Sequence, residues 1–238
     1  MKAWAMVPAR GGSKSIPYKN LAVLAGRALI DYGVLAVQAS GRCERIVCST
    51  EDQRIAERAE ALGIEVDTRP TRLAGDDTAV ADVARDFLAR ATAPLPDVLV
   101  LIQPTSPFLL PQHIGALLDR IASNPSAQSA QTVAAIPHNH HAWNQRVVTD
   151  PVVHFAFREE RARAYNKQSK PKLYAFGNLV MVRPAALRLG LDFFAEPSVA
   201  LEIPRPYDFD VDSAEDLALA SAIMASGAVS LSHLGTTL

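Results

Sequence analysis

Cysteine is scarce in this sequence, and Cys43 and Cys48 are the only two among 238 residues. Two cysteines do not make the disulfide framework of a small secreted domain, and they imply no zinc site. No apolar run is as long as a membrane span, and the N-terminal segment lacks the apolar stretch and cleavage site of a signal peptide. These absences predict a cytoplasmic protein without membrane attachment.

The chain also has no excess of basic over acidic residues. The chain has 24 Lys and Arg against 25 Asp and Glu, a formal net charge of −1, whereas general nucleic-acid-binding proteins usually carry a basic surplus. We therefore expect no nucleic-acid partner. Apolar residues make up 49% and charged residues 21% of the chain, as in an ordinary globular protein. This length is enough for one large α/β domain with a buried core.

Apolar runs alternate along the chain with segments of helical periodicity. This alternation predicts βαβ units, and therefore an α/β fold with a mainly parallel sheet. Residues 137–171 are rich in His, Arg, Asn and Gln and are predicted to form a hairpin-bearing insertion, whereas residues 226–238 are predicted to be a flexible tail. Strands are predicted at 1–7, 45–49, 64–66, 97–103, 131–136 and 173–182, and helices at 29–39, 52–62, 78–91, 113–122 and 214–224.

The stretch 7–20, VPARGGSKSIPYKN, follows the first predicted strand. The Gly11–Gly12 pair lets the backbone approach a ligand closely, and consecutive N–H groups in such a loop bind anions. Arg10, Lys14 and Lys19 add cations that bind phosphate oxygens. The loop matches neither the Walker A pattern nor the dinucleotide-binding pattern. A polyphosphate site and an ordinary solvated surface turn are equally compatible with this composition.

Polar residues end the strongest predicted strand, 97–103, in the string Gln103-Pro104-Thr105-Ser106-Pro107. In an open parallel sheet, ligands bind at the carboxyl ends of the strands. Polar side chains that become buried there also need hydrogen-bond partners. The residues of this string are therefore candidates for ligand contacts.

Three aspartates, Asp208, Asp210 and Asp212, lie in a stretch, 204–212, that is predicted to be extended. Residues two apart share one side of an extended chain. Repulsion among the carboxylates favours a cation, and magnesium takes one or two carboxylates together with phosphate oxygens. The alternative is an acidic cap for the helix predicted at 214–224. By spacing alone, the cap is somewhat favoured.

Four histidines in and near the insertion, His138, His140, His141 and His154, invite a zinc interpretation. Their irregular spacing and the lack of a nearby cysteine or carboxylate disfavour it. A polar surface or a sugar site is favoured instead.

The loop string P-A-R-G-G-S-K-x-I-P-x-K-N-L, R-P-x-x-L-A-x-D at 69–76, Q-P-T-S-P and the D-x-D pair together resemble the motifs of the acylneuraminate cytidylyltransferases, the CMP-sialic acid synthetases and their relatives. The resemblance extends from residue 1 to about residue 220. It implies a three-layer α/β sandwich with a mainly parallel sheet, the nucleotide-diphospho-sugar transferase fold. It also implies a single cytidylyltransferase domain at 1–225, with an insertion at about 137–172 for dimerisation and acceptor binding.

The resemblance implies a role for each motif as well. The catalytic residues would be Arg10, Lys19, Asp210 and Asp212, and the two aspartates would bind Mg²⁺. The nucleotide-binding residues would be Arg10, Gly11, Gly12, Ser13, Lys14, Asn20, Arg69 and Asp76. The acceptor-binding residues would be Gln103, Thr105, Ser106, Lys167, Gln168 and Asn178.

Departures from the family pattern fall mainly on the acceptor side. Lys167 stands where the family has Arg, Gly177-Asn178-Leu179 replaces N-G-A, and a lysine that commonly follows the His-His pair is missing. In the loop, Ser15 replaces a glycine, which removes no charge. We therefore expect nucleotide handling to be intact, and N-acetylneuraminic acid not to be the best acceptor.

The reaction that the resemblance implies joins CMP from CTP to a nonulosonic, sialic-acid-like sugar and releases pyrophosphate, in a homodimer. Two alternatives are open. A metal-dependent glycosyltransferase of similar fold would explain the acidic pair, but it does not explain the basic Gly-rich loop at the start of the chain. A non-catalytic protein that binds CTP or a CMP-sugar would explain the motifs without turnover, although the full set of basic and acidic residues speaks against it.

Overall fold

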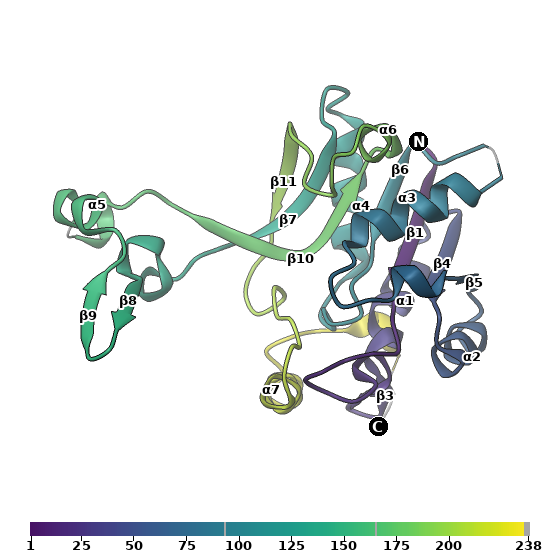
Figure 1. The fold of residues 1–238 in the computed structure, drawn as a ribbon, viewed down its shortest axis with the longest axis horizontal. Helices are drawn as coiled ribbons and strands as arrows, with labels where there is room; N and C mark the ends of the chain where they lie inside the picture. Colours follow the sequence, from purple (N-terminus) through teal and green to yellow (C-terminus); the bar gives the residue numbers. More distant parts are fainter. Residues whose placement is uncertain (93, 165, 236–238) are drawn as a thin grey trace.

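A main sheet of mixed direction forms the centre of the molecule (Figure 1). The computed structural model describes residues 1–92, 94–164 and 166–235. Within these residues, the sheet has seven strands in the order β11-β7-β10-β6-β1-β4-β5. All neighbouring strands are parallel except β10, which is antiparallel to both β6 and β7. The prediction of an α/β fold with a mainly parallel sheet is confirmed.

Helices alternate with the strands along most of the chain. The strands of the main sheet are β1 (Ala3–Pro8), β4 (Arg45–Thr50), β5 (Glu65–Thr68), β6 (Val98–Leu101), β7 (Ser129–Ala135), β10 (Tyr174–Val182) and β11 (Ser198–Glu202). The helices are α1 (Leu29–Ser40), α2 (Gln53–Ala61), α3 (Val80–Arg90), α4 (Pro111–Ala122), α5 (Arg158–Arg163), α6 (Pro184–Arg188) and α7 (Ala214–Ala225). Two hairpins, β2 (Val23–Leu24) with β3 (Arg27–Ala28) and β8 (Arg146–Thr149) with β9 (Val152–Phe155), lie outside the main sheet. No helix in the described part of the chain is both long and apolar enough to cross a membrane.

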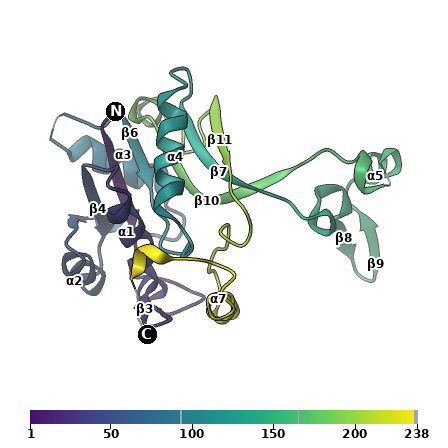
Figure 2. The same ribbon diagram turned by 180° about the vertical axis from the view of Figure 1, so that it is seen from behind.

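Helices cover both faces of the sheet because its central strands are apolar on both faces. In β1, Ala5 and Val7 belong to a core that includes α1, α2 and α4, whereas Trp4 and Met6 belong to a second core with α3 and α6. Figure 2 shows α1 and α4 on the near face of the sheet. The result is the expected three-layer sandwich.

The predicted insertion forms an arm that projects from this body on β7 and β10 (Figures 1 and 2). The arm carries the β8–β9 hairpin, whose residues pair from Arg146 with Phe155 to Thr149 with Val152. The prediction that this segment contains a hairpin is confirmed. Val148 and Val153, which face each other across the hairpin, are 69% and 54% exposed.

One sequence-based expectation about the C-terminal part is wrong. The stretch 204–212 is not extended throughout, because the N–H of Tyr207 donates to Pro204 O at 3.1 Å and a turn follows. The segment predicted to be a flexible tail contacts the body at two points within the described residues, which end at 235. Val229 is buried beside α1 and α7, and Arg27 Nη2 donates to Leu234 O at 2.8 Å.

Candidate active site

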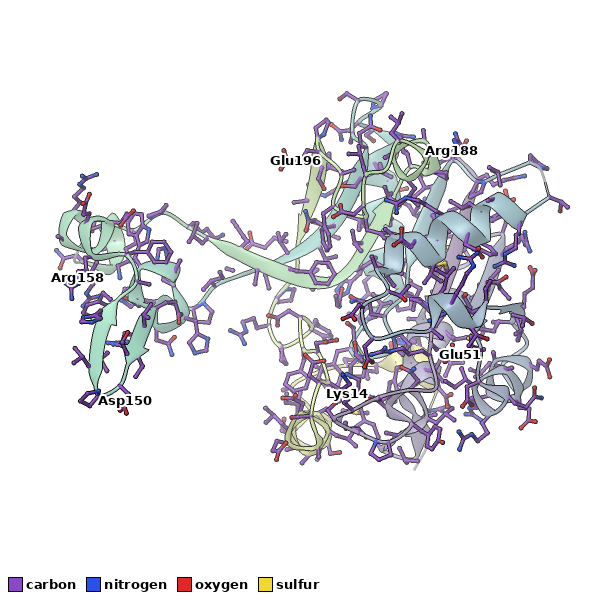
Figure 3. The ribbon with its side chains drawn as sticks, viewed as in Figure 1. Lys14, Glu51, Asp150, Arg158, Arg188 and Glu196 are labelled. Carbon is purple, nitrogen blue, oxygen red and sulfur yellow. The ribbon has the colours of Figure 1, made fainter. Side chains whose placement is uncertain are left out.

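A cleft of about 480 Å³ opens at the carboxyl ends of β1, β5 and β6. This is the edge at which open α/β sheets bind ligands. Figure 3 places Lys14 and Glu51 at this end of the body, away from Arg188 and Glu196 at the other end. The cleft is lined by Pro8, Arg10, Gly12, Ser13, Lys14, Ser15, Lys19, Asn20, Arg69, Asp76, Val80, Gln103, Pro104 and Thr105.

The Gly-rich loop is fixed at both ends. At its start, the N–H of Ala9 donates to Ser49 O at 3.1 Å, which continues the pairing of β1 with β4. At its end, Asn20 Nδ2 donates to Arg10 O at 2.9 Å. Gly11 has no room for a side chain, because a Cβ there would lie 2.5 Å from Asp52 Oδ2. The loop therefore lies closely on the N-terminus of α2.

Each of the three cations of the loop has a carboxylate partner from a distant part of the sequence. Arg10 Nη1 lies 2.6 Å and Lys14 Nζ 2.7 Å from the carboxylate of Asp76. Lys19 Nζ donates to Asp212 Oδ1 at 3.1 Å. Hydrogen bonds from Lys14 and Arg10 lower the pKa of Asp76, so it is ionised at neutral pH. The positive charge of the loop is thus partly neutralised in the free protein.

Arg69 enters the cleft from the end of β5, where its side chain is only 5% exposed. Its Nη2 donates to Ser49 O at 2.5 Å, which holds the guanidinium against the end of β4. Burial lowers the pKa of Arg69, although the charges of Glu51 and Asp67 oppose this effect. A buried cation in a cleft is a place where an acceptor on a ligand would be favoured.

Asp210 and Asp212 do not make the capping hydrogen bonds of α7. The cap of α7 is formed by Ser213 and Asp216, whose side chains bond to each other's backbone N–H. Asp210 Oδ1 instead accepts from Ser106 Oγ at 3.2 Å, and Asp212 faces Lys19. Both carboxylates are therefore available to a cation.

The donor set suits magnesium only if substrate completes it. In the described part of the chain, no group of three His, Cys, Asp or Glu side chains is placed to hold a metal. Magnesium is usually bound by one or two carboxylates plus phosphate oxygens and water. Asp210 and Asp212, next to a loop with phosphate-binding chemistry, fit that requirement, whereas Asp208 pairs with Arg205 at 3.5 Å.

The residues expected to contact the acceptor are not all together. Gln103 and Thr105 line the cleft. Gln168 is exposed on the arm, and the side chain of Lys167 lies outside what the structure describes. Ser106 is 2% exposed and holds Asp210, so its expected acceptor contact is replaced by a positioning contact.

The prediction that Asn178 contacts the acceptor is wrong. Its side chain is fully buried, Nδ2 donates to Tyr207 O at 2.8 Å, and Oδ1 accepts from Thr132 Oγ1 at 3.2 Å. The amide also lies 3.2 Å from Nδ1 of the buried His113. With both ends bonded inside the protein, Asn178 connects β10 and β7 to the turn at 204–208 and does not face a ligand.

Sequence reasoning missed Glu51. It follows β4 beneath the loop, where Glu51 Oε1 accepts from the N–H of Gly11 at 2.7 Å. The signal was a polar run, Ser49 to Asp52, after a buried strand, the same pattern that identified Gln103 to Ser106. Asp52 is the N-cap of α2, and its side chain accepts from two backbone N–H groups.

Comparisons with known proteins point to one family. A family model described as cytidylyltransferase matches residues 4–214. The CMP-N,N'-diacetyllegionaminic acid synthase of Legionella pneumophila is 39% identical over 117 residues, which is 48% of this chain and 50% of that protein. The N-acylneuraminate cytidylyltransferase of Escherichia coli O18:K1:H7 is 25% identical over 224 residues, 93% of this chain and 52% of that protein.

The chain spans about half the length, or less, of the curated relatives that it matches. Among solved structures, a CMP:2-keto-3-deoxy-manno-octonic acid synthetase complexed with CTP superimposes with a TM-score of 0.73 at 17% identity. That match covers 95% of this chain and 99% of the other. At this identity the likeness supports the fold alone.

Proposed function

Because the chain belongs to the cytidylyltransferase family, we propose that it transfers CMP from CTP to a nonulosonic, sialic-acid-like sugar and releases pyrophosphate. The observation that carries the proposal is the contact between Lys19 Nζ and Asp212 Oδ1 at 3.1 Å. These residues are 193 positions apart in the sequence, yet the fold joins the basic loop to the acidic pair. A site for a triphosphate and its cation requires both.

The reaction is an in-line substitution at phosphorus. The anomeric hydroxyl of the sugar loses its proton, which passes to solvent, and its oxygen forms a new bond to the α-phosphorus. The bond from that phosphorus to the bridging oxygen breaks, so that pyrophosphate leaves. Catalysis of this kind is mostly positioning and neutralisation of charge. Arg10 and Lys19 would stabilise the phosphate charge, with Lys14 beside them, and Asp210 and Asp212 would hold Mg²⁺. When bound, the metal neutralises phosphate oxygens and polarises the reacting centre.

For the nucleotide, we propose CTP as the substrate. Asn20 and Arg69 line the cleft together with Gly12 of the loop, and Arg69 is a buried cation there. Pyrophosphate release measured with CTP, ATP, GTP and UTP tests this proposal. We expect kcat/KM to be at least tenfold higher with CTP. A comparable value with any other nucleotide would contradict it.

Removal of a loop cation tests the site itself. Lys14→Met should weaken CTP binding, because Lys14 lies in the cleft and contacts Asp76. Lys2→Met is a matched control, since Lys2 pairs with Glu44 at the opposite end of β1. Equal kcat/KM in the two variants would argue against a triphosphate in this cleft.

The acceptor is proposed to be an acidic sugar, on evidence from the arm. Arg161 Nη1 and Lys170 Nζ each donate to Asn144 Oδ1 at 2.6 Å. Two cations thus converge on a neutral amide, and desolvation together with the charge of Arg161 lowers the pKa of Lys170. A carboxylate would be favoured there. Turnover with neuraminic, legionaminic, pseudaminic and octulosonic acids tests the choice, and a tenfold advantage for N-acetylneuraminic acid would contradict our expectation.

We also propose that the chain forms a C2 homodimer in the cytoplasm, and that the arm is its interface. The arm contains the acceptor candidate Gln168. Figure 3 shows Arg158, on the same arm, far from the cleft residue Lys14 of the body. A second subunit would bring an arm to each cleft. The hairpin valines Val147, Val148, Val152 and Val153 are all more than half exposed, and such apolar surface on a projecting element is typical of an interface.

A further inference from the structure

Glu51 lies directly beneath the Gly-rich loop and contacts its backbone at Gly11. The pairing of β1 with β4 ends when the N–H of Ala9 donates to Ser49 O. Two residues later, the N–H of Gly11 donates to Glu51 Oε1 at 2.7 Å. A hydrogen bond from a backbone N–H to a carboxylate is among the stronger kinds in proteins. The loop is therefore fixed to the end of β4 by a charged side chain.

The second carboxylate oxygen of Glu51 faces Arg69. Glu51 Oε2 is buried, makes no hydrogen bond in the described structure, and lies 4.0 Å from Arg69 Nη1. Arg69 Nε is likewise buried without a partner. Unpaired buried polar atoms are uncommon and costly. Here an acceptor and a donor of opposite charge lie together at the edge of the cleft that Arg69 lines.

The residue that follows Glu51 is held in place by the helix. Asp52 is the N-cap of α2, and a Cβ on Gly11 would lie 2.5 Å from its Oδ2. Residues 51 and 52 thus both lie against the loop at Gly11. A carboxylate under an anion-binding loop repels a triphosphate. Its presence there favours binding only if it also holds the binding groups in position.

We propose that Glu51 is a positioning residue that fixes the phosphate loop and the guanidinium of Arg69 relative to each other. One oxygen anchors the N–H of Gly11, and the other supplies the negative charge that keeps buried Arg69 in the cleft. This proposal rests on the proposed binding of CTP. It assigns Glu51 no contact with substrate, and its effect should appear in nucleotide binding rather than in sugar binding.

The test compares Glu51→Gln and Glu51→Ala with Glu60→Gln, a matched control that removes a charge from the exposed side of α2. Glutamine keeps an acceptor for Gly11 but removes the charge beside Arg69, whereas alanine removes both. We expect the Kd for CTP, measured by calorimetry with the full chain, to rise about tenfold in Glu51→Gln, which is about 1.4 kcal/mol. The rise should be larger in Glu51→Ala, and the KM for the sugar should stay within twofold of wild type in Glu51→Gln.

A second measurement does not depend on nucleotide. Amide exchange of Gly11 in the free protein should be slow in wild type and in Glu51→Gln, and fast in Glu51→Ala. A Kd for CTP in Glu51→Gln within twofold of that in Glu60→Gln would overturn the proposal. If wild type binds no CTP, the proposed function fails, and the role of Glu51 is then decided by exchange alone. Equal amide exchange rates of Gly11 in wild type and Glu51→Ala would overturn the proposed role of Glu51.

Discussion

Replacement of Asp210 or Asp212 should separate turnover from stability. In Asp212→Asn, the structure loses one exposed ion pair, because the Asp212 side chain is 80% exposed and contacts Lys19 at 3.1 Å. Exposed pairs contribute about 0–1 kcal/mol to folding. In Asp210→Asn, an amide oxygen can still accept from Ser106 Oγ, which lies at 3.2 Å. The free energy of unfolding should therefore change by less than about 1 kcal/mol in either variant.

Turnover should respond far more strongly. If the two carboxylates hold Mg²⁺ against the phosphates, each substitution removes one of the few ligand charges, and we expect kcat to fall about 100- to 1,000-fold. That loss corresponds to about 2.7–4 kcal/mol of transition-state stabilisation. It exceeds any effect that the lost surface contacts could have on folding. A higher magnesium concentration should restore part of the rate.

Asp208→Asn provides the matched control. Asp208 has the same chemistry two residues away, but its side chain is 14% exposed and pairs with Arg205 at 3.5 Å. We expect this variant to lose about 1 kcal/mol of stability and to keep near-normal turnover. Pyrophosphate release with CTP and urea unfolding of all three variants provide the measurements. Near-normal magnesium-dependent rates in both Asp210→Asn and Asp212→Asn, or an equal loss in Asp208→Asn, would refute the metal assignment.

Three further outcomes are expected. Gly33→Ala should lower the free energy of unfolding by about 1–3 kcal/mol, because a Cβ on Gly33 would lie 2.6 Å from Ile102 Cγ2. Burial lowers the pKa of His113 from 6.5 to about 4. The free energy of unfolding should therefore fall as the pH drops from 6.5 to about 4, because in this range the unfolded chain binds a proton that the folded chain does not. In His113→Gln, the urea midpoint should no longer depend on pH in this way. If the proposed dimer forms, Val148→Lys with Val153→Lys should convert it to a monomer in light scattering.

Each of these outcomes has a control within the chain. Gly115→Ala on α4 should be neutral or slightly stabilising, since the nearest atom to its Cβ is the flexible Arg42 Nη1 at 3.4 Å. Val23→Lys changes a valine that is 66% exposed on the body and should leave the assembly unchanged. A wild type that is monomeric at micromolar concentration would contradict the proposed interface, and an unchanged pH dependence in His113→Gln would contradict the buried neutral imidazole.

The fold was largely predictable because its signals are local. Buried central strands such as 97–103 are short and continuously apolar, and the helices between them show a 3.6-residue period, so five of the helices were expected close to their observed positions. The elements that sequence reasoning missed carry weak signals. β11 (Ser198–Glu202) is a half-exposed edge strand of five residues, and α6 (Pro184–Arg188) is a single short turn of helix.

The site was predictable only where its functional residues lie in one continuous segment of the sequence. The loop at 7–20 combines glycines and cations in adjacent positions. Composition alone left an anion site and a surface turn equally open, and the resemblance of the loop string to a family motif favoured the anion site. Asn178 was assigned wrongly because its burial depends on distant neighbours. The register of β10 shifts after Phe176, and a Cβ on Gly177 would lie 2.6 Å from Thr132 Oγ1, so the chain turns Asn178 inward. No local pattern contains that information.

The pairing of every loop cation with a carboxylate has a consequence for how substrate binds. In the free protein, Asp76 holds Arg10 and Lys14, and Asp212 holds Lys19. A bare triphosphate would have to compete with these carboxylates, whereas a triphosphate that arrives with Mg²⁺ offers an anion to Lys19 and a cation to Asp212 together. Lys19 and Asp212 then give up their mutual ion pair, and each forms a new one, Lys19 with the triphosphate and Asp212 with Mg²⁺. Neither side chain is left with an unpaired charge. We therefore expect CTP to bind at least tenfold more tightly with magnesium than without it, and Asp212→Asn to abolish most of that difference. Calorimetry in both conditions measures it, and equal affinities in wild type would show that Asp212 keeps Lys19 when the nucleotide is bound.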